Sequence, residues 1–242
     1  MYEKMIPKKI HYIWFGGKPL SKVSNICINS WKEKLPEYEI IEWNEKNLDL
    51  DQLCRENKFF AECRKRKLYA YMADYLRLRI LYEQGGIYMD TDMQVLKSFD
   101  NLTDTNFLIG HASYGKIGTG FIGSEKGCLV TKRILDFYNE EIWHSELFTI
   151  PDIIGYLFEK EKFAVKVYDK DYFSPCAFDK PFSEDDITEN TYMIHWYEGS
   201  WTLNKQVVLF LMTKHISNPV KKRIIITKKW IGFYLRKIGL LK

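Results

Sequence analysis

The chain has 242 residues, 46% of them apolar and 16% aromatic, which predicts one globular α/β domain and argues against a disordered chain. Five cysteines without a Cys-x-x-Cys pair favour reduced thiols over a disulfide framework or a zinc site. No run reaches the ~18 apolar residues of a membrane-spanning helix, and no apolar signal segment opens the chain, so we expect a cytoplasmic protein.

The first part of the chain predicts a strand–helix–strand unit. Residues 9–17 read as a buried strand that ends in a glycine turn. A helix is expected from Ser21 or Ser24 as N-cap to Lys34, followed by a strand over residues 38–43. Nucleotide-binding α/β domains commonly begin in this way.

A long helix is expected over residues 61–84. It carries Asp74 and Arg77, three positions apart, in an otherwise apolar stripe. Gly85-Gly86 should end this helix, because glycine tolerates the left-handed conformation found after a helix C-terminus. A buried strand should then span residues 87–96.

The second half predicts further strands and one helix. Strands are expected over residues 107–110, 118–123, 165–168 and 192–196, and a helix over residues 129–138. These elements would complete a mixed central sheet flanked by helices.

Three Asp-x-Asp triplets occur in the chain. Residues 49–51 and 169–171 lie in polar sequence and are interpreted as solvated turns. Asp90-Thr91-Asp92 follows an apolar run, and the two-residue period of a strand would point both carboxylates the same way. Buried carboxylates need a positive partner, and Mg²⁺ or Mn²⁺ carrying a diphosphate would supply it. A carboxylate pair that only bonds backbone groups is the alternative.

Four segments in this order resemble a known family. They are residues 10–17 (IHYIWFGG), 30–32 (SWK), 73–77 (ADYLR) and 85–92 (GGIYMDTD). Together they resemble the DxD glycosyltransferases of the yeast Och1-like and bacterial capsular type (family 32), and more distantly the catalytic domains of large clostridial glucosylating toxins. The resemblance is dense over residues 6–100 and loose over 110–201. It implies a GT-A fold, a nucleotide-sugar donor, Mn²⁺ or Mg²⁺, and retention at the anomeric carbon.

The resemblance also implies roles for individual residues. Trp14 would stack on the base of the donor, Asp74 would bind sugar hydroxyls, and Arg77 would contact the donor sugar or phosphate. Asp90 would bridge ribose and metal, and Asp92 would bind the metal directly. A core tryptophan at a strand end is the alternative for Trp14, and a buried ion pair that positions the helix is the alternative for Asp74 and Arg77.

Residues 192–201 resemble the closing motif of the family, an apolar strand that ends in histidine and is followed by Ser-Trp. His195 is the candidate third metal ligand, with Glu198 as the alternative. Ser200 and Trp201 would lie near the pyrophosphate, and Lys205 would help to neutralise the departing phosphate. Contacts with the acceptor are expected in the loops 111–120 and 143–160.

Charge divides the chain into two parts. Residues 204–242 hold ten of the 36 lysines and arginines and none of the 32 acidic residues, so residues 1–203 carry a net charge of −6. We therefore predict a GT-A domain over residues 1–203 and a basic amphipathic tail over residues 204–242. The tail suits an anionic membrane surface; a plain solvated basic helix is the alternative, and nucleic-acid binding is not expected because no known binding module accompanies the charge.

These observations predict a retaining, metal-dependent glycosyltransferase. It would move a hexose or N-acetylhexosamine from a nucleotide-sugar, with UDP favoured and GDP possible, to a saccharide acceptor in bacterial surface polysaccharide synthesis. A lipid-linked acceptor would agree with a peripheral position on the inner face of the cell membrane. The rival enzyme is a sugar-nucleotide nucleotidyltransferase, for which Pro19 makes the 15–19 loop a poor phosphate loop because it lacks an amide donor. The non-enzymatic rival is a membrane-associated sugar-binding protein.

Overall fold

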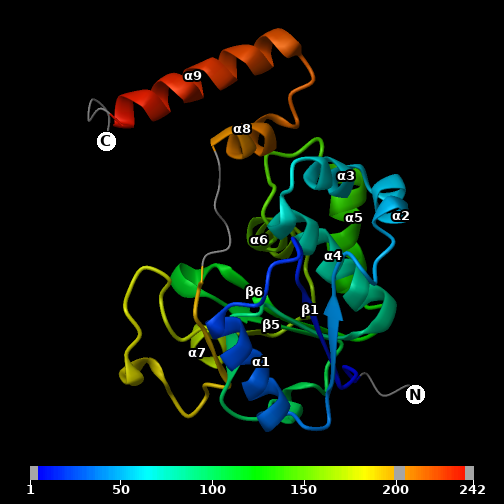
Figure 1. Ribbon diagram of the computed structural model, residues 1–242, viewed down its shortest axis with the longest axis vertical. Coiled ribbons are helices and arrows are strands. Elements are labelled where there is room, and N and C mark those ends of the chain that lie inside the picture. The colour runs from blue at the N-terminus through cyan, green and yellow to red at the C-terminus, as the bar shows by residue number, and fades with distance from the viewer. Residues whose placement is uncertain (1–4, 199–204, 238–242) are drawn as a thin grey trace.

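The computed structural model describes residues 5–198 and 205–237 (Figure 1). Six strands form one mixed sheet in the order β2-β1-β3-β6-β5-β7, and two more form a separate ribbon, β4-β8. The strands are β1 (Lys9–Ile13), β2 (Glu39–Trp43), β3 (Gly86–Met89), β4 (Met93–Val95), β5 (Phe107–His111), β6 (Ile117–Ser124), β7 (Val167–Tyr168) and β8 (Met193–His195). The α-helices are α1 (Lys22–Lys34), α2 (Leu50–Glu56), α3 (Lys58–Lys65), α4 (Tyr69–Gln84), α5 (Leu129–Asp136), α6 (Ile150–Lys160), α7 (Lys170–Phe173), α8 (Lys205–Thr213) and α9 (Pro219–Lys237).

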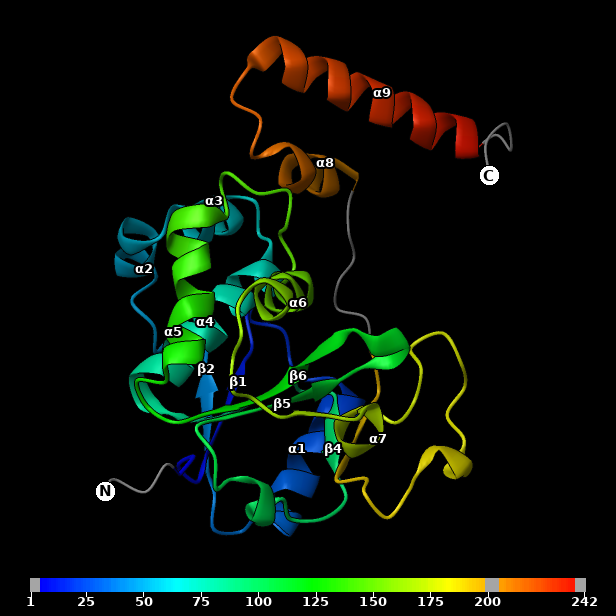
Figure 2. The same ribbon diagram turned by 180° about the vertical axis from the view of Figure 1, so that it is seen from behind.

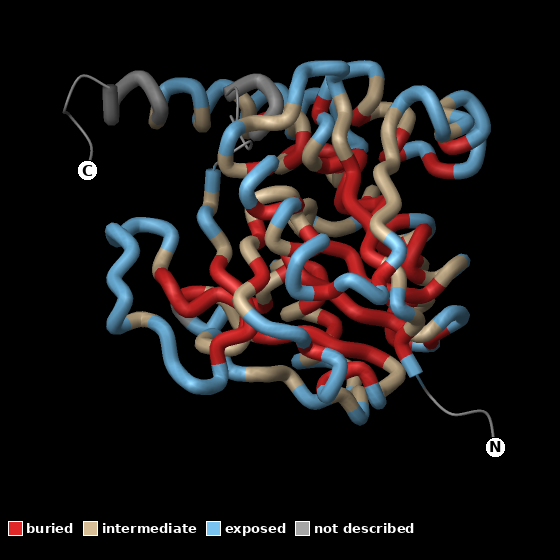
Figure 3. Tube along the Cα trace, turned by 60° about the horizontal axis from the view of Figure 1, so that its bottom comes forward, coloured by how far each residue is buried: buried red, intermediate tan, exposed pale blue. Residues whose placement is uncertain are grey.

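Helices cover both faces of the six-stranded sheet. Figures 1 and 2 show α3 to α6 gathered on one side and α1 with α7 on the other. Each side has its own apolar core, one built largely on α4, α5 and α6 and the other on α1 with the ends of β3 and β4. The buried residues follow the sheet and the helices packed against it (Figure 3). Among the described residues, no helix has the length and apolar composition to span a bilayer.

Several predicted elements are confirmed in the first half of the chain. β1 and β2 pair in parallel over their full length, and Ser21 is the N-cap of α1, where its hydroxyl accepts a hydrogen bond from the amide of Ser24. The order of parallel and antiparallel strands agrees with the predicted mixed sheet. The α/β architecture expected from sequence is therefore the one observed.

The single helix predicted over residues 61–84 is wrong. The chain forms two helices, α3 and α4, separated by a turn in which Lys67 takes a left-handed conformation (φ 56°). The amide of Leu68 reaches back to the carbonyl of Cys63, so the α-helical hydrogen-bond ladder stops there. The apolar period continues on both sides of the break, which is why the sequence pattern reads as one helix.

Other predicted boundaries also shift. The strand predicted over residues 87–96 is divided between β3 and β4, which belong to different sheets. The triplets at 49–51 and 169–171 are the first turns of α2 and α7 rather than free turns, with Asp49 and Asp169 as their N-caps. The predicted helix over residues 129–138 is α5, which runs into a π-helical turn, Phe137–Glu141.

A buried histidine links β1 and β2 to the end of α4. His11 is fully buried; its Nε2 lies 2.9 Å from the carbonyl oxygen of Gly85, and its Nδ1 accepts a hydrogen bond from the indole of Trp43. Burial lowers the pKa of His11, which keeps the ring neutral and able to accept that bond. Gly86 (φ 105°) lies directly over this histidine, and a Cβ there would come 2.9 Å from Nε2 and 2.8 Å from the carbonyl oxygen of Lys9.

We therefore expect Gly86→Ala to lower the free energy of unfolding by about 2–4 kcal/mol, since it combines left-handed strain with a clash against fixed atoms. Urea unfolding followed by circular dichroism measures the change. Gly155→Ala in α6 is the matched control, because a Cβ there meets nothing within 4 Å and should change stability by less than about 1 kcal/mol. Equal stability of the two variants would contradict the role given to Gly86.

Candidate active site

A turn after β3 presents the two aspartates of the middle triplet. β3 ends at Met89, and the amide of Asp90 donates to the carbonyl oxygen of Gly120 at 2.8 Å. The chain then turns through Thr91 and Asp92, and the amide of Met93 returns to the carbonyl oxygen of Asp90. The carboxylates are therefore presented by a turn, not by alternate positions of one strand as predicted.

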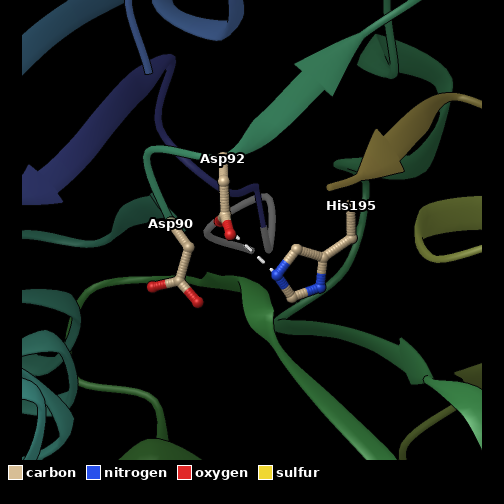
Figure 4. A group of neighbouring side chains, drawn as sticks. All are labelled: Asp90, Asp92 and His195. Carbon is tan, nitrogen blue, oxygen red and sulfur yellow. Dashed lines mark ion pairs between the residues drawn. The ribbon is translucent and has the colours of Figure 1, made fainter. Parts of the chain in front are cut away.

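The β4–β8 ribbon brings His195 to these carboxylates. Met93 pairs with His195 across the ribbon, and the backbone of Trp196 donates to the carbonyl oxygen of Asp92. The Nε2 atom of His195 lies 3.4 Å from Oδ1 of Asp92. One ligand atom from each of Asp90, Asp92 and His195 lies within 4.8 Å of the others, and the three side chains converge on one space (Figure 4). We call this set the acidic triad.

The structure separates the two candidates for the third ligand. The carboxylate of Glu198 accepts a hydrogen bond from the hydroxyl of Ser21 at 2.6 Å, so it is directed to the start of α1. Only the backbone of Glu198 faces the triad, where its amide donates to Oδ2 of Asp92 at 3.0 Å. The geometry therefore favours His195 over Glu198.

Arg77 supports the triad from beneath. It is 2% exposed, and its Nη2 lies 3.0 Å from Oδ1 of Asp74 and 3.4 Å from Oδ1 of Asp90. Its Nη1 donates to the carbonyl oxygen of Thr119 at 2.7 Å, and its guanidinium lies 4.2 Å above the ring of Tyr88. With these contacts Arg77 holds the position of Asp90. Its predicted contact with the donor stays a prediction.

The same cluster shifts the pKa values of its members. Burial raises the pKa of Asp74 to about 7, against the opposing charge of Arg77 and with a further upward effect from Asp90. Burial alone would raise the pKa of Asp92, but the neighbouring His195 and the amide of Glu198 lower it overall. Burial likewise would lower the pKa of Arg77, yet Tyr88, Asp90 and Asp74 raise it, so the guanidinium keeps its charge.

Three residues of the site escaped the sequence reasoning. The phenol of Tyr88 donates to Oδ1 of Asp90 at 2.8 Å, and Tyr197 (φ 49°) stacks on the ring of His195 with centroids 3.8 Å apart. Gly120 on β6 forms the wall of the triad, since a Cβ there would lie 3.1 Å from Oδ2 of Asp90 and 3.2 Å from Cε1 of His195. Tyr88 lies within the segment 85–92 that carries the family resemblance, and Gly120 lies in the strand predicted over residues 118–123. Nothing in the sequence marked Tyr197.

Trp14 follows β1 and is half-buried. Its indole donates to the carbonyl oxygen of Lys18 at 2.6 Å, and its ring packs at the edge of the core on the α1 side. This contact folds the Gly16-Gly17 turn back on itself. The stacking of Trp14 on a base stays a prediction, and Ser200 and Trp201 lie outside the described residues.

A cavity of about 500 Å³ lies elsewhere, between α2 and the start of α4. Its lining includes Glu45, Arg64 and Tyr69, and none of the predicted site residues. Tyr69 contacts the glycine turn from the far side, with its ring 6.2 Å from that of Phe15. Among the described residues, the group that could hold a metal ion is the acidic triad, and none of its members lines this cavity.

Part of the chain is similar to known glycosyltransferase sequences. Residues 21–108 match the family model described as a glycosyltransferase sugar-binding region containing a DXD motif, and this region includes Asp74, Arg77, Asp90 and Asp92. Subversion of eukaryotic traffic protein A of Legionella pneumophila is 32% identical over 114 residues, which is 38% of this chain and only 18% of that protein.

A solved glycosyltransferase structure has a similar fold. The structure titled PaToxG Glycosyltransferase superposes with a TM-score of 0.53 at 21% identity, over 65% of this chain and 70% of that one. This likeness confirms the predicted GT-A-type mixed sheet with flanking helices. The matched region and the shared fold together make the chain a distant relative of the glycosyltransferases that carry a DXD motif.

Proposed function

We propose that the chain is a retaining, metal-dependent glycosyltransferase. It transfers a hexose or N-acetylhexosamine from a nucleotide-sugar, with UDP as the favoured base, to a saccharide acceptor. The observation that carries this proposal is the acidic triad, formed by Asp90, Asp92 and His195 within the reach of one ion.

The chemistry of the triad fits Mn²⁺ or Mg²⁺. Two carboxylates and one imidazole offer oxygen and nitrogen ligands with no thiolate, and the described cysteines lie outside the group. The triad is only partly exposed, with Asp92 and His195 side chains 16% and 15% accessible, so it combines shielding with an open side. When bound, such an ion supplies positive charge to the diphosphate of the donor.

The chain's own residues prepare this position. Departure of the sugar leaves negative charge on the diphosphate, so groups that are fixed before the reaction stabilise it most. Arg77 holds Asp90 through an ion pair and Tyr88 holds it through a hydrogen bond, while the amide of Glu198 fixes Asp92. The ring of Tyr197 fixes the plane of His195. Little reorganisation of the triad is then needed when the donor binds.

The proposal extends to the acceptor and the place of action. A lipid-linked intermediate of bacterial surface polysaccharide is the acceptor that best suits a basic tail, and the chain would act at the inner face of the cell membrane. A sugar-nucleotide nucleotidyltransferase would release pyrophosphate instead of UDP, and a non-catalytic sugar-binding protein would release neither. Two assays with Mn²⁺ separate these three functions: release of UDP or GDP from a panel of UDP- and GDP-sugars, and release of pyrophosphate from UTP or GTP with sugar phosphates.

Asp92→Asn should lower Mn²⁺-dependent release of UDP at least about a hundredfold, because the amide weakens the metal site while keeping an acceptor for the amide of Glu198. The melting temperature should stay within a few degrees. Asp169→Asn is the control from another Asp-x-Asp triplet; this residue is exposed and makes no capping hydrogen bond, so turnover should not change. Full turnover by the Asp92 variant would end the catalytic assignment.

Gly120→Ala should weaken Mn²⁺ binding in the presence of UDP by about tenfold, since the added methyl group would crowd Asp90 and His195. Electron paramagnetic resonance of free Mn²⁺ measures the affinity directly, without turnover. Gly155→Ala provides the matched control, because a Cβ at Gly155 meets nothing within 4 Å. An unchanged Mn²⁺ affinity in the Gly120 variant would show that the ion binds elsewhere.

A further inference from the structure

The C-terminal helices form a support and a projecting element. α8 packs against the body, where Leu211 is fully buried and Phe210 lies under the guanidinium of Arg66 at 3.8 Å. Lys214 ends this contact by donating to the carbonyl oxygens of Ser145 and Leu147. α9 lies beyond α8 at one end of the long axis in both views (Figures 1 and 2). Its one side-chain bond to the body among the described residues joins Nζ of Lys229 to the sulfur of Met212 in α8, at 3.7 Å.

Some apolar side chains of α9 face away from the body, whereas Ile225 and Ile226 are half-buried on the side of Lys229. At 3.6 residues per turn, Val220, Ile224 and Ile231 lie within about 40° around the helix axis, opposite Lys229, which contacts α8. These three side chains are 66%, 50% and 52% exposed, and Trp230, about 100° around the axis from the middle of the stripe and close to Arg223, is 43% exposed. A helix in water normally turns such a face toward its own core. Here Val220, Ile224 and Ile231 form an outward stripe.

Positive charge borders this stripe on both sides. Lys221 and Lys228 lie on one margin and Arg223 on the other, and all three are exposed. The helix contains no acidic residue. An apolar stripe with basic margins, one of which also carries Trp230, matches a bilayer surface with anionic headgroups. The aliphatic groups and the indole would enter the interface, and the lysines would stay among the phosphates.

We propose that the outward face of α9, made of the stripe Val220, Ile224 and Ile231 with its basic margins and the neighbouring Trp230, docks on an anionic lipid bilayer. The helix lies flat on the surface, and α8 joins it to the body. This inference does not depend on glycosyl transfer, because binding to lipid is measured without donor or acceptor. Failure of the lipid test therefore leaves the proposed reaction standing, and failure of the donor test leaves the docking face standing.

The apolar arm of the test uses Ile224→Ser with Ile231→Ser in the full chain. Flotation with phosphatidylcholine vesicles that contain about one third phosphatidylglycerol should show binding of the wild type and a loss of at least about tenfold in the double variant. Ile26→Ser with Leu129→Ser is the matched control, since these exposed apolar residues lie on α1 and α5. The control should bind as the wild type does.

The charge arm uses Lys221→Gln with Lys228→Gln, which should lower binding about thirtyfold and weaken its dependence on salt. Lys32→Gln with Lys34→Gln removes the same charge from exposed sites on α1 and should leave binding unchanged. Equal binding to vesicles with and without phosphatidylglycerol, or no binding to either, overturns the proposal. A dimer that the Ile224 and Ile231 changes convert to a monomer also overturns it, because a second copy would then cover the face.

Discussion

The excess of negative charge around Arg77 is the constraint on which the site depends. The guanidinium of Arg77 pairs with two carboxylates, that of the fully buried Asp74 and that of Asp90, and Asp92 lies beside Asp90 in the acidic triad. A single arginine cannot balance three ionised carboxylates. Burial is the main cause of the rise in the pKa of Asp74 to about 7, and the charge of Asp90 adds to it while the charge of Arg77 opposes it. A divalent cation beside Asp90 and Asp92 would cancel the remaining two charges. This excess of negative charge is the physical reason for the metal site that we propose.

The mixed sheet places this cluster where a ligand has access. β3 runs parallel to β1 and antiparallel to β6. In the register with β6, Met89 at the end of β3 pairs with Phe121 in the middle of β6. Gly120 at that crossing leaves the side chain of Asp90 uncovered. The buried Arg77 is fixed by the carbonyl oxygen of Thr119, one residue earlier on the same strand. β6 thus forms the wall of the triad through Gly120 and fixes Arg77 through Thr119.

The sequence carried the local parts of this arrangement and missed the parts that depend on distant pairing. Asp90 and Asp92 stood out because an apolar run and a double glycine precede them. His195 was only one of two choices, since selecting it needs the register in which Met93 pairs with residue 195. Glu198 is disfavoured as the third metal ligand because its carboxylate bonds to Ser21, 177 positions away. The break at Lys67 was hidden for a different reason: the apolar period persists through it, and left-handed lysine leaves no mark in a sequence.

The C-terminal part of the chain shows why composition and packing divide a protein differently. Charge changes at residue 204, yet α8 lies after that point and is bound to the body by Leu211 and Lys214. Burial lowers the pKa of Lys214 to about 8, and its contacts hold the loop that leads into α6. The first residue of α6, Ile150, has a backbone amide that lowers the pKa of Asp74. A chain ended at residue 204 would thus lose support for the loop that leads into α6, whereas one ended after Lys214 would keep it. The packing therefore argues that α9 alone is the separable element.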